Sequence, residues 1–146
     1  MILLVTYKNI ALVVEDSDNN ARIFSERLDQ SGYQPFHVKT FDSAKSFVTF
    51  ADHLKLPLTK IVSDLDLKRA SGPLARFDGY RFMTWLYEMK SSSSVRVPDD
   101  VTLCSTMFQD DSPAYLKPVI WYVQRRVEGY GFAVVPKNVL LDSEMS

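Results

Sequence analysis

The chain has 146 residues, of which 46% are hydrophobic and 24% charged, and a formal net charge of −1. This composition is typical of a globular domain, and it excludes a disordered chain or one dominated by membrane-spanning segments. The near-zero net charge provides no general attraction to nucleic acid or to anionic lipid. Cys104 is the only cysteine, so a disulfide within the chain is excluded and a cysteine-based metal site is not expected.

The N-terminus shows no targeting signal. The segment Met1–Lys8 has no basic residues ahead of its short apolar run, and no stretch of the sequence is long enough to cross a bilayer. We therefore expect a cytoplasmic protein without a membrane-spanning segment. Because neither an internal repeat nor a linker divides the sequence, we expect residues 1–146 to form a single domain.

Short apolar strands alternate with amphipathic helices along the first half of the chain. Helix starts are marked by N-cap residues and one helix end by Gly32. The predicted elements are a strand over 9–14, a helix from 17–20 to 32, a strand over 35–39, a helix from 42–43 to the region of Pro57, and a central strand over 60–67.

The second half continues the same alternation. The predicted elements are a helix opening at 78–80, a polar surface loop over 91–94, a strand over 101–105, a helix capped by 110–113, and a strand over 132–135. Pro118 either kinks the fourth helix or marks its true start. Alternating strands and helices predict right-handed βαβ units, and therefore a doubly wound α/β domain with a parallel sheet.

Acidic residues follow two of the predicted strands. Asp64 and Asp66 end the central apolar run, and Glu15 and Asp16 end the first strand. In open α/β sheets the carboxyl edge is where ligands bind, and like charges gathered there require a cation. These positions favour a metal-dependent carboxylate site centred on Asp64, although Asp64 as a simple turn residue is the alternative.

Four stretches, in this order and strand context, resemble the receiver domain of two-component response regulators. They are Ala11–Ser17, Ile61–Leu67, Asp78–Tyr80 and Val101–Ser105, and Lys137 follows the last strand. The resemblance extends from about Asn9 to Lys137. It implies a flavodoxin-like, five-stranded parallel sheet in the order 2-1-3-4-5. The last helix is expected to be short or missing, because residues 138–146 are too few to form it fully.

The same resemblance implies a phosphorylation site. Asp64 would accept a phosphoryl group from a histidine kinase or a phosphotransfer protein. The Ser105 hydroxyl would sense that group, with Thr106 as its rival, and Lys137 would pair with the phosphoryl oxygens. Such a domain would be a phospho-acceptor that assists its own transfer and switches a partner-binding face, and would not be an enzyme in the usual sense.

The resemblance also implies Mg²⁺ as the cofactor. Asp16 and Asp64 would hold the ion directly, Asp66 through its main-chain carbonyl, and Glu15 through water. This set suits an ion that prefers six oxygen ligands and retains several waters.

Two features depart from the family pattern. About seven extra residues lie within segment 68–77, with Lys68, Arg69 and Arg76 among them. They form either a docking or gating loop over the site or a tolerated surface insertion. The family usually has Lys-Pro after the last strand, whereas this chain has Pro136-Lys137. If Pro136 occupied the lysine position, the phosphoryl clamp would be lost.

Two other functions remain open. A degenerate receiver would bind partners by shape, without phosphorylation. The set Asp64, Asp66, Ser105 and Lys137 is also similar to the motifs of haloacid-dehalogenase phosphohydrolases, although that family places its nucleophile on the first strand. Because no nucleic-acid-binding segment is visible, output is expected through a protein. That protein would be a second copy or a downstream partner, on the flank left open by the short last helix.

Overall fold

Five parallel strands form one sheet in the order β2-β1-β3-β4-β5, as the sequence predicts. The computed structural model describes residues 8–67, 77–108 and 114–142. The strands are β1 (Ile10–Val14), β2 (Gln34–Val38), β3 (Leu58–Asp64), β4 (Asp100–Ser105) and β5 (Ala133–Pro136). The helices are α1 (Asp18–Gln30), α2 (Phe41–His53), α3 (Asp78–Ser92), α4 (Lys117–Gly129) and α5 (Lys137–Asp142). Two short 3₁₀ turns, Thr106–Phe108 and Ala114–Leu116, lie between β4 and α4.

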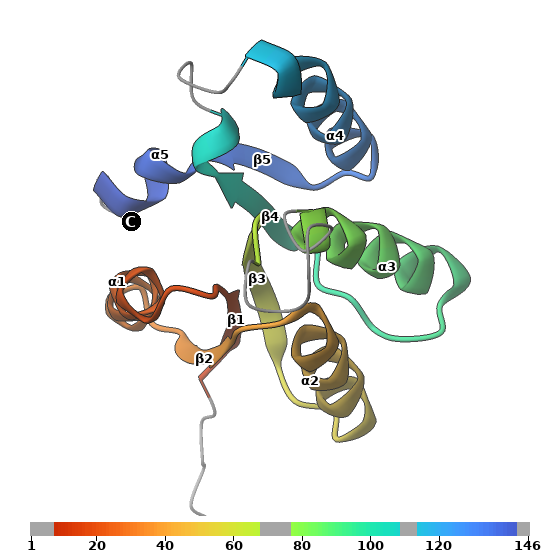
Figure 1. The fold of residues 1–146 in the computed structure, drawn as a ribbon. Helices are drawn as coiled ribbons and strands as arrows, with labels where there is room; N and C mark the ends of the chain where they lie inside the picture. The colour runs from red at the N-terminus through yellow and green to blue at the C-terminus, as the bar shows by residue number, and fades with distance from the viewer. Residues whose placement is uncertain (1–7, 68–76, 109–113, 143–146) are drawn as a thin grey trace, which may run out of the picture.

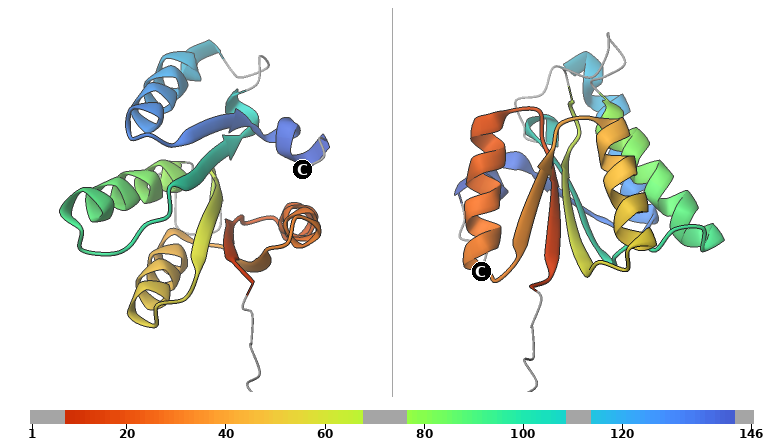
Figure 2. Two further views of the ribbon diagram at one scale, coloured as in Figure 1. Left: turned by 180° about the vertical axis from the view of Figure 1, so that it is seen from behind. Right: turned by 90° about the horizontal axis from the view of Figure 1, so that it is seen from below.

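Helices cover both faces of the sheet, which makes the fold doubly wound. Helices α2, α3 and α4 lie on one face, and α1 and α5 lie on the other (Figures 1 and 2). The larger core cluster, with Leu12, Ile61 and Leu103, packs under α2, α3 and α4. The smaller cluster, with Val13, Val62 and Cys104, packs under α1 and α5. Alternate residues of each central strand thus supply the two cores.

The strand positions follow from burial and backbone chemistry. Every residue of β1 is buried, as expected of a strand covered on both faces. In the edge strand β2, the Gln34 N–H donates to the Asn9 carbonyl and the Val38 carbonyl accepts from Glu15 N–H. In a parallel strand, alternate residues direct their backbone N–H and carbonyl groups toward the same neighbouring strand. Gln34 bonds to β1, so Pro35, which has no N–H to donate, faces the open edge of the sheet.

Two differences from the predicted elements have physical causes. The third strand ends at Asp64 and not at Leu67. Leu65 and Leu67 are apolar because the loop after the strand buries them in the larger core cluster. The predicted polar loop over 91–94 is wrong at its start, since α3 extends to Ser92. The Ser92 hydroxyl donates to the Glu88 carbonyl one turn earlier, which allows serine to remain within the helix.

The C-terminal elements decide two open points. Helix α4 begins at Lys117 with Pro118 in its first turn, so Pro118 marks the start and not a kink. The last helix, α5, is short, as predicted, and Arg27 of α1 donates to the carbonyls of Leu140 and Leu141 at its end. The predicted helix cap over 110–113 and the basic residues Lys68, Arg69 and Arg76 lie outside the described residues. None of the described helices is both long and apolar enough to span a membrane.

We predict that Phe82→Ala lowers the free energy of unfolding by about 3–5 kcal/mol. Phe82 is fully buried, with its ring centroid 6.5 Å from that of Phe41 and 6.2 Å from that of Trp85. Phe50→Ala is the control, because Phe50 is 58% exposed, and its change should stay within about 0.5 kcal/mol. Urea denaturation measures both. Equal losses in the two variants would contradict the assigned core.

Candidate functional site

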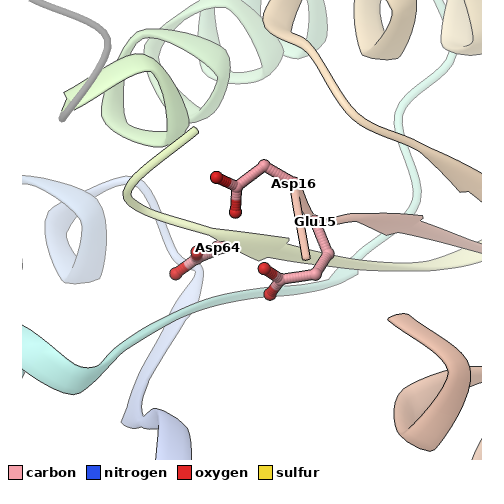
Figure 3. A group of neighbouring side chains, drawn as sticks. All are labelled: Glu15, Asp16 and Asp64. Atoms are coloured by element: carbon pink, nitrogen blue, oxygen red, sulfur yellow. The ribbon is translucent and has the colours of Figure 1, made fainter. Parts of the chain in front are cut away.

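The carboxyl ends of β1 and β3 place three acidic side chains together. These strands pair in parallel, with Val14 beside Ser63, so Glu15, directly after β1, lies next to Asp64, the last residue of β3. Asp16 follows Glu15 in the chain, and Figure 3 shows the three carboxylates at the two strand ends. One carboxylate oxygen from each lies within 4.8 Å of the others. This grouping was predicted from the sequence, because acidic residues follow two of the predicted parallel strands.

Lys137 supplies a positive charge to the carboxylates. Its Nζ lies 2.8 Å from Glu15 Oε2 and 3.1 Å from Asp64 Oδ2. All three side chains are buried, with Glu15 fully inaccessible to solvent. Strand β5 runs through Pro136, which pairs with Ser105 of β4, so the next residue leaves the strand at the carboxyl edge. Lys137 therefore reaches Asp64 despite the inverted Pro136-Lys137 order.

Burial and mutual charge perturb the ionisation of this trio. Burial raises the pKa of Glu15 from 4.5 to about 7, and the Asp64 charge adds to the rise while Lys137 opposes it. Burial likewise raises the pKa of Asp64 from 3.8 to about 6, opposed by the charge and hydrogen bond of Lys137. Burial alone would lower the pKa of Lys137, but the two carboxylates outweigh it and raise that pKa. Perturbed pKa values of this kind cluster at functional sites.

The acidic group opens into a polar cavity of about 300 Å³. Its lining contains every site residue expected from the sequence: Glu15, Asp16, Asp64, Asp66, Ser105, Thr106 and Lys137, together with Ser17 and Asn20. The two candidate hydroxyls differ in setting. Ser105 is buried and its Oγ accepts the Met107 N–H at 3.0 Å, whereas Thr106 is exposed. A serine hydroxyl that accepts one hydrogen bond can donate another, so Ser105 could donate to a group bound in the cavity.

Two supports of Glu15 hold the acidic group in place. Ser17, the N-cap of α1, donates its backbone N–H to Glu15 Oε1 at 3.1 Å. His37 Nε2 lies 2.6 Å from the Glu15 carbonyl oxygen, and because a carbonyl can only accept, Nε2–H is the donor. His37 was not predicted from the sequence to be a neighbour of the site. Its position follows from the register of β1 and β2, in which His37 pairs with Val13.

Gly79 is required by a close backbone approach. A Cβ at this position would lie 2.1 Å from the Asp64 carbonyl oxygen and 2.6 Å from Leu65 Cα. The Gly79 N–H also donates to the Leu65 carbonyl at 2.9 Å. The start of α3 is therefore packed directly on the backbone that carries Asp64, and only glycine permits that distance.

The donor set determines which cation the site could hold. Glu15, Asp16 and Asp64 offer carboxylate oxygens only, and the nearby Cys104 is fully buried in the core with a strongly raised pKa caused by that burial. Oxygen-only ligands suit a hard divalent cation such as Mg²⁺ or Ca²⁺ and disfavour zinc or copper. The residues present thus fit the Mg²⁺ ion that the sequence analysis predicted.

No protein-family model and no curated protein matches this sequence. Solved structures do match it. The signal receiver domain of a Luxo repressor protein from Vibrio parahaemolyticus is 20% identical, with a TM-score of 0.60, and the match covers 93% of this chain and 83% of that one.

The solved structure of a plant receiver domain also matches this chain. The receiver domain of the histidine kinase CKI1 from Arabidopsis thaliana, complexed with Mg²⁺ and BeF₃⁻, is 18% identical with a TM-score of 0.62. That match covers 90% of this chain and 82% of the other. The chain therefore has the fold of response-regulator receiver domains, as the sequence resemblance predicted.

We predict that Gly79→Ala destabilises the chain by about 1–3 kcal/mol, because the added methyl group must displace α3 or the Asp64–Leu65 backbone. Gly129→Ala in α4 is the matched control, since nothing lies within 4 Å of a Cβ there, and it should leave stability unchanged or raise it slightly. Amide NMR shifts should change at Asp64 and Leu65 only in the first variant. Unchanged shifts at both residues would contradict the close contact.

We predict that stability without metal falls as pH rises from 4 to 8. In this window the folded state binds more protons than the unfolded chain, because the folded pKa values of Asp64 and Glu15 are raised to about 6 and 7. Asp64→Asn should therefore gain about 2 kcal/mol at pH 8 and much less at pH 4. Asp100→Asn on β4 is the control. Equal pH slopes for wild type and Asp64→Asn, measured by urea denaturation with a chelator present, would show the opposite.

Proposed function

We propose that the chain acts as a phospho-accepting receiver in two-component signalling, with Asp64 as the acceptor. One observation carries the proposal. Asp64 is a buried carboxylate that faces a polar cavity, lies 3.1 Å from a buried lysine, and shares the cavity with the carboxylates of Glu15, Asp16 and Asp66. The receiver fold supports it, because the two solved structures described above, from a bacterium and a plant, are receiver domains.

Asp64 has an ionisation state suited to nucleophilic attack. A pKa of about 6 leaves most of its carboxylate deprotonated at neutral pH. In the transfer, a carboxylate oxygen forms a bond to phosphorus while the bond from phosphorus to the donor's imidazole nitrogen breaks. The imidazole keeps the electron pair and takes up a proton, and Asp64 becomes an acyl phosphate. The donor would be a phosphohistidine of a histidine kinase or phosphotransfer protein.

The other charged residues make that attack feasible. Two anions approach each other in the reaction, so catalysis consists mainly of positioning and charge neutralisation. Glu15, Asp16 and Asp64, with the Asp66 main chain, would hold Mg²⁺, which supplies positive charge to the phosphoryl oxygens. Lys137 holds the Asp64 carboxylate in position before the transfer. The chain would act as a stoichiometric acceptor that assists its own phosphorylation.

The response to phosphorylation would begin at Lys137 and the hydroxyls after β4. Formation of the acyl phosphate removes the carboxylate charge of Asp64 and places the charged phosphoryl oxygens beside it, so Lys137 can pair with those oxygens. Ser105 or Thr106 can donate a hydroxyl to the same group, and Thr106 begins the turn that leads toward α4. A shift of this turn would change the surface presented to a partner.

A second function is favoured by one contact. Lys137 lies closer to Glu15 than to Asp64, so the buried acidic pair is already partly neutralised by the chain itself. A receiver-like module that binds partners without phosphorylation would need no more than this. Metal binding separates the two functions, because only the phospho-acceptor requires it.

We predict that beryllofluoride, a mimic of the phosphoryl group, binds only when Mg²⁺ is present. Backbone NMR shifts should appear at Asp64, Ser105 and Lys137, and should be absent in Asp64→Asn. Asp100→Asn removes a carboxylate from the neighbouring strand β4, outside the cavity, and this variant should respond as the wild type does.

Two results would contradict this proposal. No response to Mg²⁺ or to the mimic would leave the phosphorylation-independent module as the better account. Continuous turnover of p-nitrophenyl phosphate, abolished in Asp64→Asn, would instead indicate a phosphohydrolase of the haloacid-dehalogenase type.

A further inference from the structure

Exposed aromatic side chains gather on α4 and on the turn that precedes it. We define the α4 patch by six residues: Tyr115, Val119, Trp121, Tyr122, Arg125 and Arg126. Tyr115 is 77% exposed, Trp121 59% and Tyr122 53%. The two arginines are also exposed. Large aromatic rings are costly to leave in water, and a cluster of them on one helix is typical of an interaction surface.

The fold does not require these aromatic residues. Helix α4 packs on the sheet through Ile120, Val123 and Val127, which are buried in the larger core cluster. The patch residues lie on the remaining sides of the helix. Helix α4 also lies on the opposite face of the sheet from α5 and α1 (Figure 1). The patch is thus separate from the flank beside the short last helix, where the sequence analysis expected a partner.

Each arginine of the patch stacks on an aromatic ring. Arg125 Cζ lies 5.3 Å from the centroid of the Trp121 ring. Arg126 Cζ lies 6.0 Å from the centroid of Tyr122 and 5.7 Å from that of Tyr130. Among the residues that the structure describes, no carboxylate forms an ion pair with either guanidinium. Stacking fixes the orientation of a guanidinium. Arg126 also hydrogen-bonds the hydroxyls of Tyr80 and Tyr130. Arg125 makes no such bond among the described residues, so its N–H edge can bind a carboxylate in a bidentate manner.

We propose that the α4 patch is a docking surface for an acidic protein segment, in which carboxylates flank apolar side chains. The aromatic rings would receive the apolar side chains, and Arg125 and Arg126 would bind the carboxylates. Tyrosine, tryptophan and arginine are the residues that contribute most to binding energy at protein interfaces. The surface is complete without phosphorylation of Asp64, so this binding does not depend on the proposed function.

Two other occupants fit the patch less well. Nucleic-acid bases would stack on open ring faces, and Trp121 and Tyr122 each already have a guanidinium on one side, which leaves fewer faces for bases. A second copy of the chain, related by a two-fold axis, would bring Arg125, Arg126 and the exposed Lys117 against their own counterparts. Like charges at the centre of an interface oppose such a dimer.

The test uses the full chain and a pair of synthetic peptides. One is a short helix-forming peptide with leucines along one face and glutamates beside them, labelled with fluorescein, and the other has every glutamate replaced by glutamine. We expect the glutamate peptide to bind at least about tenfold more tightly at about 0.15 M salt, because each guanidinium gains a charge-assisted hydrogen bond. NMR shifts should map to the α4 patch and include the Trp121 indole.

Variants localise the effect. The double variant Arg125→Gln, Arg126→Gln should remove the preference for glutamate, and Trp121→Ala should weaken binding of both peptides. Phe50→Ala and Arg96→Gln change an exposed aromatic and an exposed arginine elsewhere, and should leave binding unchanged.

Four outcomes would overturn the proposal. They are equal affinity for the two peptides, no binding of either at millimolar concentration, tighter binding of a single-stranded oligonucleotide through the patch, and a concentration-dependent dimer that Trp121→Ala abolishes.

Discussion

The ion pairs of Lys137 with Glu15 and Asp64 are the interaction on which the candidate site depends. Two buried carboxylates on neighbouring strands would repel each other, and burial together with neighbouring negative charge raises the pKa of both. A single ammonium group within 3.1 Å of both makes the arrangement tenable. It also joins the last strand of the sheet to its two central strands. The protein therefore retains an acidic, ionisable centre in its interior, where an ordinary fold would place apolar residues.

The fold brings the residues of this centre together beside the cavity. Parallel strands deliver their carboxyl ends to one edge, so residues far apart in the chain meet there without any change to the core. Gly79 packs α3 onto the Asp64 backbone, while Ser17 and His37 fix Glu15 from the other side. The cavity is thereby built on strand ends and helix starts, and sites on such elements are positioned more precisely than sites on loops. The α4 patch follows β4 and Thr106 in the chain, which makes it a candidate output surface for the site.

The strand order was predictable from the resemblance to receiver domains. The acidic group was predictable from the residues, because apolar runs that end in carboxylates indicate both burial and the edge of a sheet. The reach of Lys137 was not, since the Pro136-Lys137 order leaves the last strand residue undetermined until β5 pairs with β4. His37 was missed because its contact depends on the register of β2, which hydrophobic pattern does not fix. Strand three was predicted too long because Leu65 and Leu67 are buried by a loop, and burial in a loop has the same apolar signature as burial in a strand.

The most direct measurement is the mass of the intact protein after treatment with phosphoramidate and Mg²⁺. If Asp64 is the acceptor, the chain gains the mass of one phosphoryl group, and hydroxylamine removes it because an acyl phosphate is labile to that reagent. The gain should disappear with a chelator and in Asp64→Asn, while Asp52→Asn on α2 keeps it. No mass gain in the wild type, or an unchanged gain in Asp64→Asn, would contradict the assignment of Asp64 as the phospho-acceptor.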